Sequence, residues 1–255
     1  MRIYSKSFIH YTKDFEAIKG IIENGFRVHF CKEEVYSESG KTTYIGIPMA
    51  CFCDITLSHI KEMSKYGKMC VGMGREWGVD HLLQPVLYYP NNKDCESTKM
   101  IIEAEKAFIE NQKRSGSEQD SESYKILGYA KPLFKLSKKT QDLNCADNSN
   151  YIDREWRRVY PSKGQHRWKT LGEYEKYMKK NKDSDTKIHI GSPLKFSVKD
   201  IDFIVIQNKF LSDMHKFIMD DLKRIGGKEK VDITQREREL LLSKIITYET
   251  LIGNM

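Results

Sequence analysis

The N-terminal part of the chain combines a short apolar run with a helical repeat. Residues 8–12 predict a strand that ends in a turn. Apolar side chains then recur at helical spacing at Phe15, Ile18 and Ile22, and Gly25 predicts the end of that helix. Residues 8–25 therefore predict a strand followed directly by an amphipathic helix.

Similar alternation of apolar and polar positions continues along the chain and predicts a sheet. Residues 35–43 are polar and predict a loop, whereas residues 201–207 are almost wholly apolar and predict a buried strand. The other predicted strands are residues 44–53, 68–74, 85–89 and 151–160. Helical patterns fall between them, at residues 58–67, 97–108 and 168–182.

Two helices are predicted at the C-terminal end. Met214, Phe217 and Ile218 begin an apolar stripe that ends at the glycines 226–227, and Thr234 opens a capping box before a second helix that runs through residue 246. The sequence thus predicts an α/β (α+β) core domain over residues 1–210, with a central mixed, split sheet flanked by helices. A helical pair, residues 211–255, is predicted to pack on that core.

Composition narrows the class of protein. Hydrophobic residues make up 39% and charged residues 31% of the 255 residues, which is typical of a globular protein. No apolar run approaches the roughly 20 residues that a membrane span needs. Residues 1–8 lack the apolar core of a signal peptide. We expect a cytoplasmic protein with no membrane contact.

The charge is basic, with a net value of +7 and a pI near 8.9. Clusters of Lys and Arg attract phosphate, so nucleic-acid contact is one interpretation, and a solvated lysine-rich surface is the other. The basic runs are Arg154, Arg157, Arg158, Lys163, Arg167, Lys169 and residues 179–182.

The six cysteines do not form a metal motif. Cys51 and Cys53 are two residues apart in a predicted strand and share one face, but zinc sites usually need paired Cys-x-x-Cys or Cys/His clusters. Reduced thiols are therefore expected, and no metal.

Candidate chemistry lies where polar side chains interrupt apolar segments. His10 and Thr12 stand at the end of the first predicted strand, and Asp54 follows the strand that ends at residue 53. Tyr66 precedes a glycine and a second strand. Each has a plainer interpretation: His10 as a hydrogen-bonded structural histidine, and Asp54 as a turn cap.

Glu155 is the most unusual of these residues, because it lies in a predicted strand between Arg154 and Arg157. Unpaired charge inside a sheet costs several kcal/mol. Glu155 is therefore either a functional carboxylate or an ion-pair partner of Arg154, Arg157 or Arg75. The chain contains no phosphate-binding P-loop, no nucleophile elbow and no His-Glu-x-x-His motif.

Together these segments resemble the abortive phage resistance family AbiGi. The matching segments are residues 8–12, 48–58, 66–67, the Gly-x-Gly-x-Glu-Trp run at 72–77, and residues 84–88 and 154–157. Thr56 stands where the family pattern has proline. The resemblance implies the antitoxin of a two-gene abortive-infection system, whose partner protein resembles a nucleotidyltransferase toxin.

The order of the motifs is also similar, more distantly, to DarT-like ADP-ribosyltransferases. This second resemblance implies that His10 holds NAD and that Glu155 is the catalytic carboxylate. The NAD-binding residues it implies are His10, Thr12, Tyr44, Asp54, Tyr66 and Arg154. The first block lacks the arginine that those enzymes carry downstream, unless Arg27 supplies it.

Two functions from different classes follow from these resemblances. The first is a phage-defence protein with an ADP-ribosyltransferase-like fold that uses NAD as substrate to modify a nucleic acid or a protein. The alternative is a non-enzymatic antitoxin that binds a nucleotidyltransferase-like toxin or represses its operon.

Overall fold

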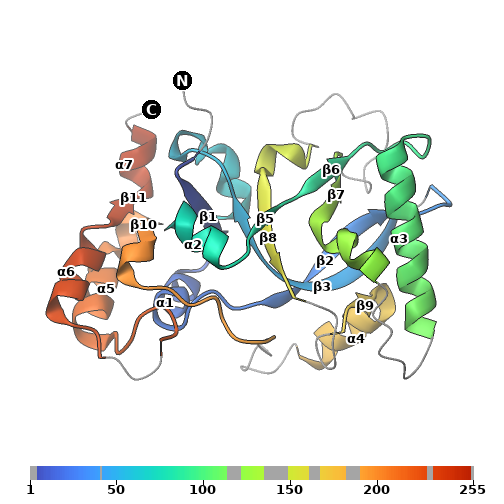
Figure 1. Ribbon diagram of the computed structural model, residues 1–255. Coiled ribbons are helices and arrows are strands. Elements are labelled where there is room, and N and C mark those ends of the chain that lie inside the picture. Colours follow the sequence, from blue (N-terminus) through green and yellow to red (C-terminus); the bar gives the residue numbers. More distant parts are fainter. Residues whose placement is uncertain are drawn as a thin grey trace. The chain divides into compact units, whose positions relative to one another are not determined.

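The chain folds into two compact units, shown in a computed structural model (Figure 1). The described residues are 5–40, 42–113, 122–134, 149–160, 167–181, 190–228 and 232–253. Unit 1 comprises residues 1–27, 51–83 and 192–255, and unit 2 comprises residues 28–50 and 84–191.

Residues 211–255 belong to unit 1, together with the N-terminal strand, whereas the sequence predicts a domain boundary after residue 210. In Figure 1 the orange and red C-terminal elements share this unit with the dark-blue β1. The reason is strand pairing, because the last strand of the chain joins a sheet that also contains β1.

The sheet of unit 1 has the strand order β11-β10-β4-β1. These strands are β1 (Ser7–Thr12), β4 (Met69–Gly74), β10 (Ile201–Ile206) and β11 (Ile245–Thr247). The pairs β1–β4 and β4–β10 are antiparallel, and β10–β11 is parallel. Ile9 of β1 also pairs with Cys53, the last residue of β3 (Thr42–Cys53).

Helix α1 (Phe15–Asn24) shows how sequence sets local structure in unit 1. Asp14 caps the helix by accepting a hydrogen bond from the N–H of Glu16. Phe15, Ile18 and Ile22 form the buried face. Gly25 ends the helix at a φ of 79°, a conformation that glycine adopts without steric cost. The buried face and the terminating glycine agree with the sequence prediction.

The remaining helices of unit 1 are short. They are η1 (Leu57–His59), η2 (Glu62–Tyr66), α2 (Arg75–Asp80), η8 (Val198–Asp200), η9 (Asn208–Phe210), α5 (Leu211–Lys216), the π-helical η10 (Phe217–Asp221), α6 (Gln235–Leu242) and α7 (Tyr248–Gly253). Helices α1 and α2 contact β1 and β4.

The predicted last helix is wrong beyond residue 242. Ile245 and Ile246 continue the helical spacing, but they form β11 and pair with Ile204 and Val205 of β10. Branched side chains favour strands, and the buried strand β10 provides the neighbour that a strand needs. Long-range pairing therefore overrides the local pattern.

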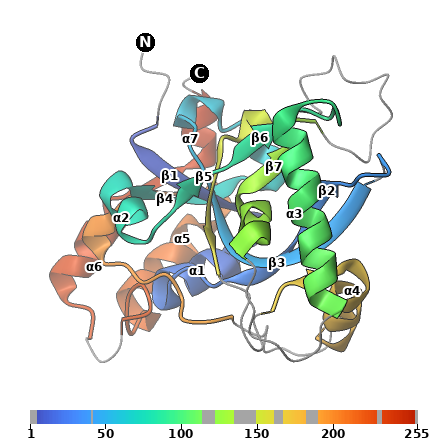
Figure 2. The ribbon, with the colours of Figure 1, turned by 45° about the vertical axis from the view of Figure 1, so that its right-hand side comes forward.

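Unit 2 contains a second set of strands, mostly antiparallel. They are β2 (His29–Tyr36), β3 up to residue 50, β5 (Gln84–Pro85), β8 (Glu155–Val159), β9 (Lys169–Thr170) and the parallel pair β6 (Leu87–Tyr89) and β7 (Ala130–Pro132). Its helices are α3 (Glu96–Lys113), η3 (Glu122–Tyr129), η6 (Tyr151–Asp153) and α4 (Leu171–Lys180). Helix α3 packs against β2 and η3 (Figure 2).

Of the polar segment 35–43, predicted as a loop, residues 35–36 and 42–43 belong to strands β2 and β3, and residues 37–40 form a turn between them. Strands β2 and β3 pair in register from His29 opposite Met49 to Tyr36 opposite Thr42. The charges of β2 obscured the strand, and Glu33 is nevertheless buried. Its burial is compensated by an ion pair, described below.

The mixed α/β class is confirmed, with mainly antiparallel pairing in both units. In the part of the chain that the structure describes, no helix is long and apolar enough to cross a membrane.

Candidate functional site

The residues predicted as a single site fall into both units. His10, Thr12, Asp54 and Tyr66 belong to unit 1, and Tyr44, Arg154 and Glu155 belong to unit 2.

Glu155 is the first residue of β8, and its carboxylate is enclosed in ion pairs. The Oε1 atom accepts a hydrogen bond from Arg157 Nε at 2.6 Å, and the Oε2 atom accepts one from Lys131 Nζ at 2.8 Å. Residues 155 and 157 lie on the same face of the strand because strand side chains alternate. Only 8% of the Glu155 side chain is exposed, so both oxygens are occupied inside unit 2.

Arg157 extends this arrangement into a network of four charges. Its guanidinium is fully buried, and its Nη2 donates to Glu33 Oε2 at 2.5 Å. Its Nη1 donates to the carbonyl of Gly128 at 3.1 Å. Two carboxylates and two cations therefore balance, and the guanidinium uses its planar fork to hold both carboxylates. We call Glu33, Lys131, Glu155 and Arg157 the charge network.

The electrostatics of the network favour full ionisation. Burial by itself would raise the pKa of Glu155, but the charges of Arg157 and Lys131 outweigh burial and hold that pKa well below its ordinary value. Burial lowers the pKa of Lys131, but the carboxylates of Glu155 and Glu33 more than reverse the effect. Glu155 is thus ionised and fixed in direction, with Arg157 as the ion-pair partner that the plainer interpretation anticipates.

Two members of the network, Glu33 and Lys131, were missed by sequence reasoning. Glu33 stands in a polar run and Lys131 between Ala130 and Pro132, and neither position carries a motif. The only available signal was Glu155 itself, because a carboxylate in a strand requires cations nearby.

Arg154, predicted to bind NAD, precedes this network in an unusual backbone conformation. It ends η6 with a φ of 41°, in the left-handed region that non-glycine residues rarely occupy. The turn places Glu155 at the start of β8, where its N–H donates to the hydroxyl of Tyr88 at 2.9 Å. Tyr44, on β3, has the ammonium of Lys32 4.2 Å from its ring centroid.

His10 lies in unit 1 among aromatic side chains. Its Nδ1–H donates to the carbonyl of Cys51 at 2.8 Å, and its ring meets Phe26 edge-on at 5.3 Å and Phe52 at 5.5 Å between centroids. Burial lowers the pKa of His10, and the hydrogen bond to Cys51 only partly opposes this. The ring is therefore neutral near pH 7, with Nε2 as its acceptor nitrogen.

The other predicted residues of unit 1 have local partners. Thr12 Oγ1 accepts from the N–H of Asp14 at 3.2 Å, in the turn before α1. Asp54 pairs with Arg75, whose guanidinium also donates to the carbonyl of Ser5 at 2.8 Å. Tyr66 is 41% exposed at the end of η2. Asp54 therefore has a structural partner in Arg75.

The basic runs are only partly available to a nucleic acid. Arg157 is fully buried in the charge network, so that part of the phosphate-contact prediction is wrong. Lys169 lies 4.4 Å from the ring centroid of Phe30, and Arg167 donates to the carbonyl of Gln112 at 3.2 Å. Lys179 and Lys180 are exposed on α4, and Lys163 and Lys182 lie outside the described residues.

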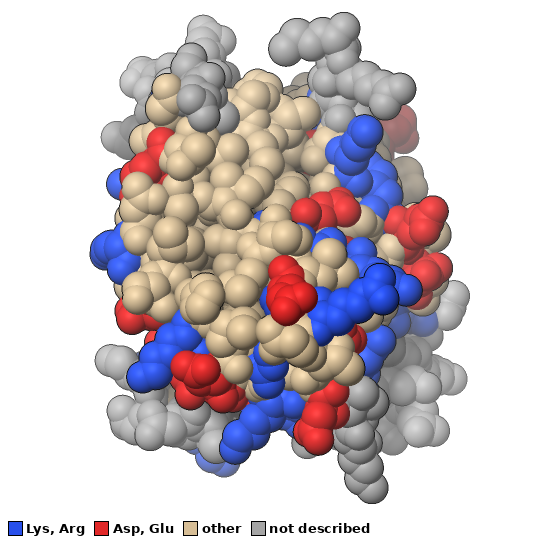
Figure 3. Space-filling model, turned by 90° about the vertical axis from the view of Figure 1, so that its left-hand side faces the viewer, with Lys and Arg blue, Asp and Glu red and all other residues tan. Residues whose placement is uncertain are grey.

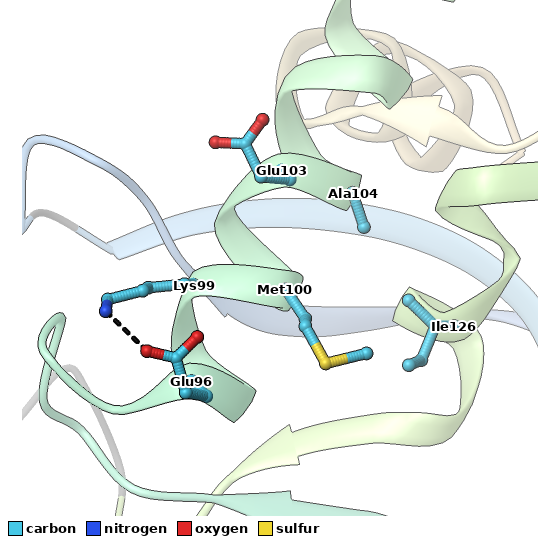
Figure 4. Close-up of a pocket in the computed structure, with 6 residues that line it drawn as sticks. All are labelled: Glu96, Lys99, Met100, Glu103, Ala104 and Ile126. Atoms are coloured by element: carbon cyan, nitrogen blue, oxygen red, sulfur yellow. Dashed lines mark hydrogen bonds and ion pairs between the residues drawn. The ribbon is translucent and has the colours of Figure 1, made fainter.

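A groove of about 610 Å³ opens in unit 2, between α3 and η3. Figure 4 shows its lining, with Met100 and Ile126 pointing toward each other and Lys99 paired with Glu96 at 2.6 Å. No residue predicted to bind NAD lines this groove. Among the described residues, no group of three or more His, Cys, Asp or Glu side chains is arranged to hold a metal.

Comparisons with known proteins place the chain in a family. Residues 24–207, well over half of the chain, match the family described as "Putative abortive phage resistance protein AbiGi, antitoxin". An abortive phage resistance protein AbiGi from Lactococcus lactis subsp. cremoris is 23% identical over 229 residues, which cover 80% of this chain and 86% of that protein. No solved structure matches the chain. The chain therefore belongs to the AbiGi family of abortive phage resistance proteins, as its motifs predicted.

Proposed function

We propose that this protein acts as the antitoxin of an abortive-infection pair and restrains a protein toxin by binding it, without catalysis. The family description names an antitoxin, which implies a toxin as partner. The observation that carries the proposal is the occupied carboxylate of Glu155. Lys131 and Arg157 take both of its oxygens inside the core of unit 2.

A catalytic carboxylate must reach its substrate. In ADP-ribosyl transfer, nicotinamide leaves the ribose of NAD, and a carboxylate stabilises the positive charge that develops on the ribose. Glu155 would have to release Lys131 or Arg157 to do so, and breaking a buried ion pair costs about 3–5 kcal/mol. ADP-ribosyl transfer from NAD is therefore the second candidate function. The feature that supports it is the acceptor nitrogen of His10.

Exposed aliphatic side chains supply what a toxin could contact. In unit 1, Val79 is 65% exposed and Leu82 is 56% exposed, at the end of α2. Leu82 also has a φ of 56°, and the left-handed region costs a non-glycine residue about 1–2 kcal/mol. This conformation closes α2, and the N–H of Leu83 donates to the carbonyl of Gly78 across it at 2.9 Å, so the turn holds the side chain of Leu82 toward solvent. Val79 and Leu82 are our candidates for toxin contact.

Co-expression with the toxin of the pair tests the proposal. The parent should restore growth, and Leu82→Asp should lose this protection while keeping its circular dichroism spectrum and melting temperature. Met178→Asp is the matched control, because Met178 is 47% exposed on α4 of unit 2. Full protection by Leu82→Asp, with Val79→Asp also neutral, would exclude this surface.

Labelled NAD tests the rival enzyme. Pure protein and cell lysate should give no transfer of label if binding alone restrains the toxin. If label is transferred and Glu155→Gln abolishes it while remaining folded, the binding proposal is wrong. We expect instead that Glu155→Gln lowers the melting temperature, because it removes the negative charge that pairs with the buried cations of Lys131 and Arg157.

Repression of the operon is the remaining form of antitoxin action. Lys176, Lys179 and Lys180 are exposed on α4 and could contact DNA phosphates. Such binding must weaken steeply with salt, because neutralised phosphates release counterions. Fluorescence anisotropy with operon DNA at two salt concentrations tests whether the protein binds this DNA. The triple variant with glutamine at these three positions should bind the DNA more weakly.

A further inference from the structure

Strands β2 and β3 of unit 2 form an antiparallel hairpin whose two faces differ. Side chains alternate between the faces of a strand, so odd-numbered residues of the hairpin share one face and even-numbered residues share the other. The odd-numbered face contains Glu33 of the charge network and is mostly buried. On the even-numbered face Lys32 is exposed, and Glu34, Tyr36 and Tyr44 are half-buried. We call the even-numbered face the outer face of the hairpin.

Helix α4 covers one end of the outer face. Lys169 of β9 pairs with Gly46 of β3, and Tyr174 of α4 packs on Gly46 so closely that a Cβ atom there would lie 2.8 Å from the tyrosine ring. Tyr177 of the same helix meets Phe30 edge-on, with 5.0 Å between ring centroids. Figure 1 shows α4 beside β9 and β3. The helix thus leaves the other end of the outer face, toward the hairpin turn, partly exposed.

Ammonium groups lie over aromatic rings along this face. Lys32 Nζ is 4.2 Å from the ring centroid of Tyr44, and Lys169 Nζ is 4.4 Å from that of Phe30. The hydroxyl of Tyr44 is hydrogen-bonded to the carboxylate of Glu34, which fixes the direction of the ring. Because Lys32 is exposed, its contact with Tyr44 shows that this ring is reached from the solvent side.

The outer face and the helix beside it carry an excess of positive charge. The basic residues of the outer face and of residues 169–180 are Lys32, Lys169, Lys176, Lys179 and Lys180, and the acidic ones are Glu34, Glu173 and Glu175. Glu173 is bound in the cap of α4, where it accepts from the N–H of Thr170 at 2.8 Å. The net charge of +7 is not spread evenly, since Figure 3 shows a broad area of one face of the molecule without Lys, Arg, Asp or Glu. Local positive charge beside aromatic rings favours a ligand that is both anionic and aromatic.

We infer that the outer face of the hairpin binds single-stranded nucleic acid, with bases stacked on Tyr44 and Tyr36 and with phosphates bound by lysines. An unpaired base stacks on a tyrosine ring, and the phosphate beside it attracts an ammonium group. Lys32 is exposed and exchanges the Tyr44 ring for that phosphate. Tyr36 and Tyr44 are diagonal neighbours, because Tyr36 lies opposite Thr42 and Tyr44 lies opposite Glu34. Such neighbours are about 7–8 Å apart, so one strand reaches both rings.

The tyrosines distinguish this inference from contact with duplex DNA. The bases of a duplex are already paired and stacked, so a duplex offers phosphates to the lysines of α4 but no free base to Tyr44. The toxin contact proposed at Val79 and Leu82 belongs to unit 1, and the inference does not rest on it.

Anisotropy of a labelled single-stranded DNA of about 10 nucleotides tests the binding. DNA serves as the probe because stacking and phosphate contacts do not need the 2′-hydroxyl of RNA. Tyr44→Ala should bind at least about fivefold more weakly, whereas Tyr44→Phe should bind as the parent does, since its ring still stacks. Tyr151→Ala is the matched control, because Tyr151 is 54% exposed elsewhere in unit 2. The duplex of the same sequence should bind more weakly than the single strand.

The salt dependence of the affinity separates charge from stacking. For a single strand, each lost phosphate contact makes the slope of log affinity against log salt concentration less steep by about 0.7. Lys32→Gln should show this change, whereas Tyr44→Ala should lower the affinity and keep the slope. Lys99→Gln, at a lysine of α3 that is 52% exposed, should alter neither quantity.

Circular dichroism of each variant shows whether it is folded, and Tyr36→Ala replaces Tyr44→Ala as the stacking variant if the latter does not fold. A parent that does not bind the single strand would overturn the inference. So would a duplex bound as tightly as the single strand, or parental affinity in the folded stacking variants.

Discussion

The two units bury polar groups in opposite ways. Unit 2 encloses the charge network, in which Arg157 is bound to both Glu155 and Glu33. Unit 1 encloses mainly neutral polar groups, although its buried Asp54 is paired with Arg75. His10 lies among aromatic rings, and the buried hydroxyl of Tyr11 lacks a hydrogen-bond partner among the described residues.

This difference predicts how the stability of each unit responds to substitution of its buried polar residues. A buried charge network is stable only when complete, since the removal of one member leaves another charge without compensation. A buried hydroxyl that lacks a hydrogen-bond partner among the described residues, such as that of Tyr11, has no such dependence, so its removal costs little. We therefore expect large losses of stability from substitutions in the charge network of unit 2, and smaller losses from substitutions at His10 and Tyr11 in unit 1.

The largest expected effect is that of Arg157→Ala. It leaves the buried carboxylates of Glu155 and Glu33 without their shared cation and should cost about 3–5 kcal/mol of unfolding free energy. Urea denaturation followed by circular dichroism measures the loss. Arg158→Ala is the matched control, because Arg158 is only half-buried and lies 5.5 Å from the ring centroid of Tyr160. Equal losses in the two variants would show that the charge network contributes no more to stability than an ordinary arginine of unit 2.

A smaller effect is expected from His10, and it depends on pH. The folded state lowers the pKa of His10 below 6.5, so the unfolded state binds a proton first as pH falls. The stability contributed by neutral His10 is complete above pH 6.5 and should decline below it, by up to about 1.4 kcal/mol per pH unit. Stability of the parent and of His10→Phe between pH 7.5 and about pH 5.5 gives the difference. Parallel pH profiles would show that His10 has an ordinary pKa.

The smallest expected effect is that of Tyr11→Phe. Burial raises the pKa of Tyr11, and its hydroxyl gains no hydrogen bond in the described part of unit 1. Removing an unsatisfied buried hydroxyl should leave stability unchanged or raise it by about 1 kcal/mol. Thermal unfolding measures the change, with Tyr89→Phe in unit 2 as the control, because the Tyr89 hydroxyl accepts from the N–H of Tyr36 at 3.2 Å. A large destabilisation by Tyr11→Phe would indicate a hidden partner.

The candidate site was only partly predictable from the sequence. Glu155 and Arg157 were recognisable, because charge in a strand is costly and the two residues share one face. Lys131 and Glu33 were not, since they come from β7 and β2, far away in the sequence. A distant ion-pair partner has no local signature. The NAD-binding roles of His10, Thr12, Tyr44, Asp54, Tyr66 and Arg154 stay predictions.

What the sequence determined by itself is the local structure whose causes are local. Helix α1 illustrates this, because its cap, its buried face and its terminating glycine lie within residues 14–25. The tertiary structure decided the secondary structure and the burial of segments whose stability depends on distant partners. Ile245 and Ile246 became a strand because β10 offered backbone hydrogen bonds, and Glu33 was buried because Arg157 neutralised it. The free energy of a charge or a strand edge depends on what excludes water from it, and only the folded chain sets that.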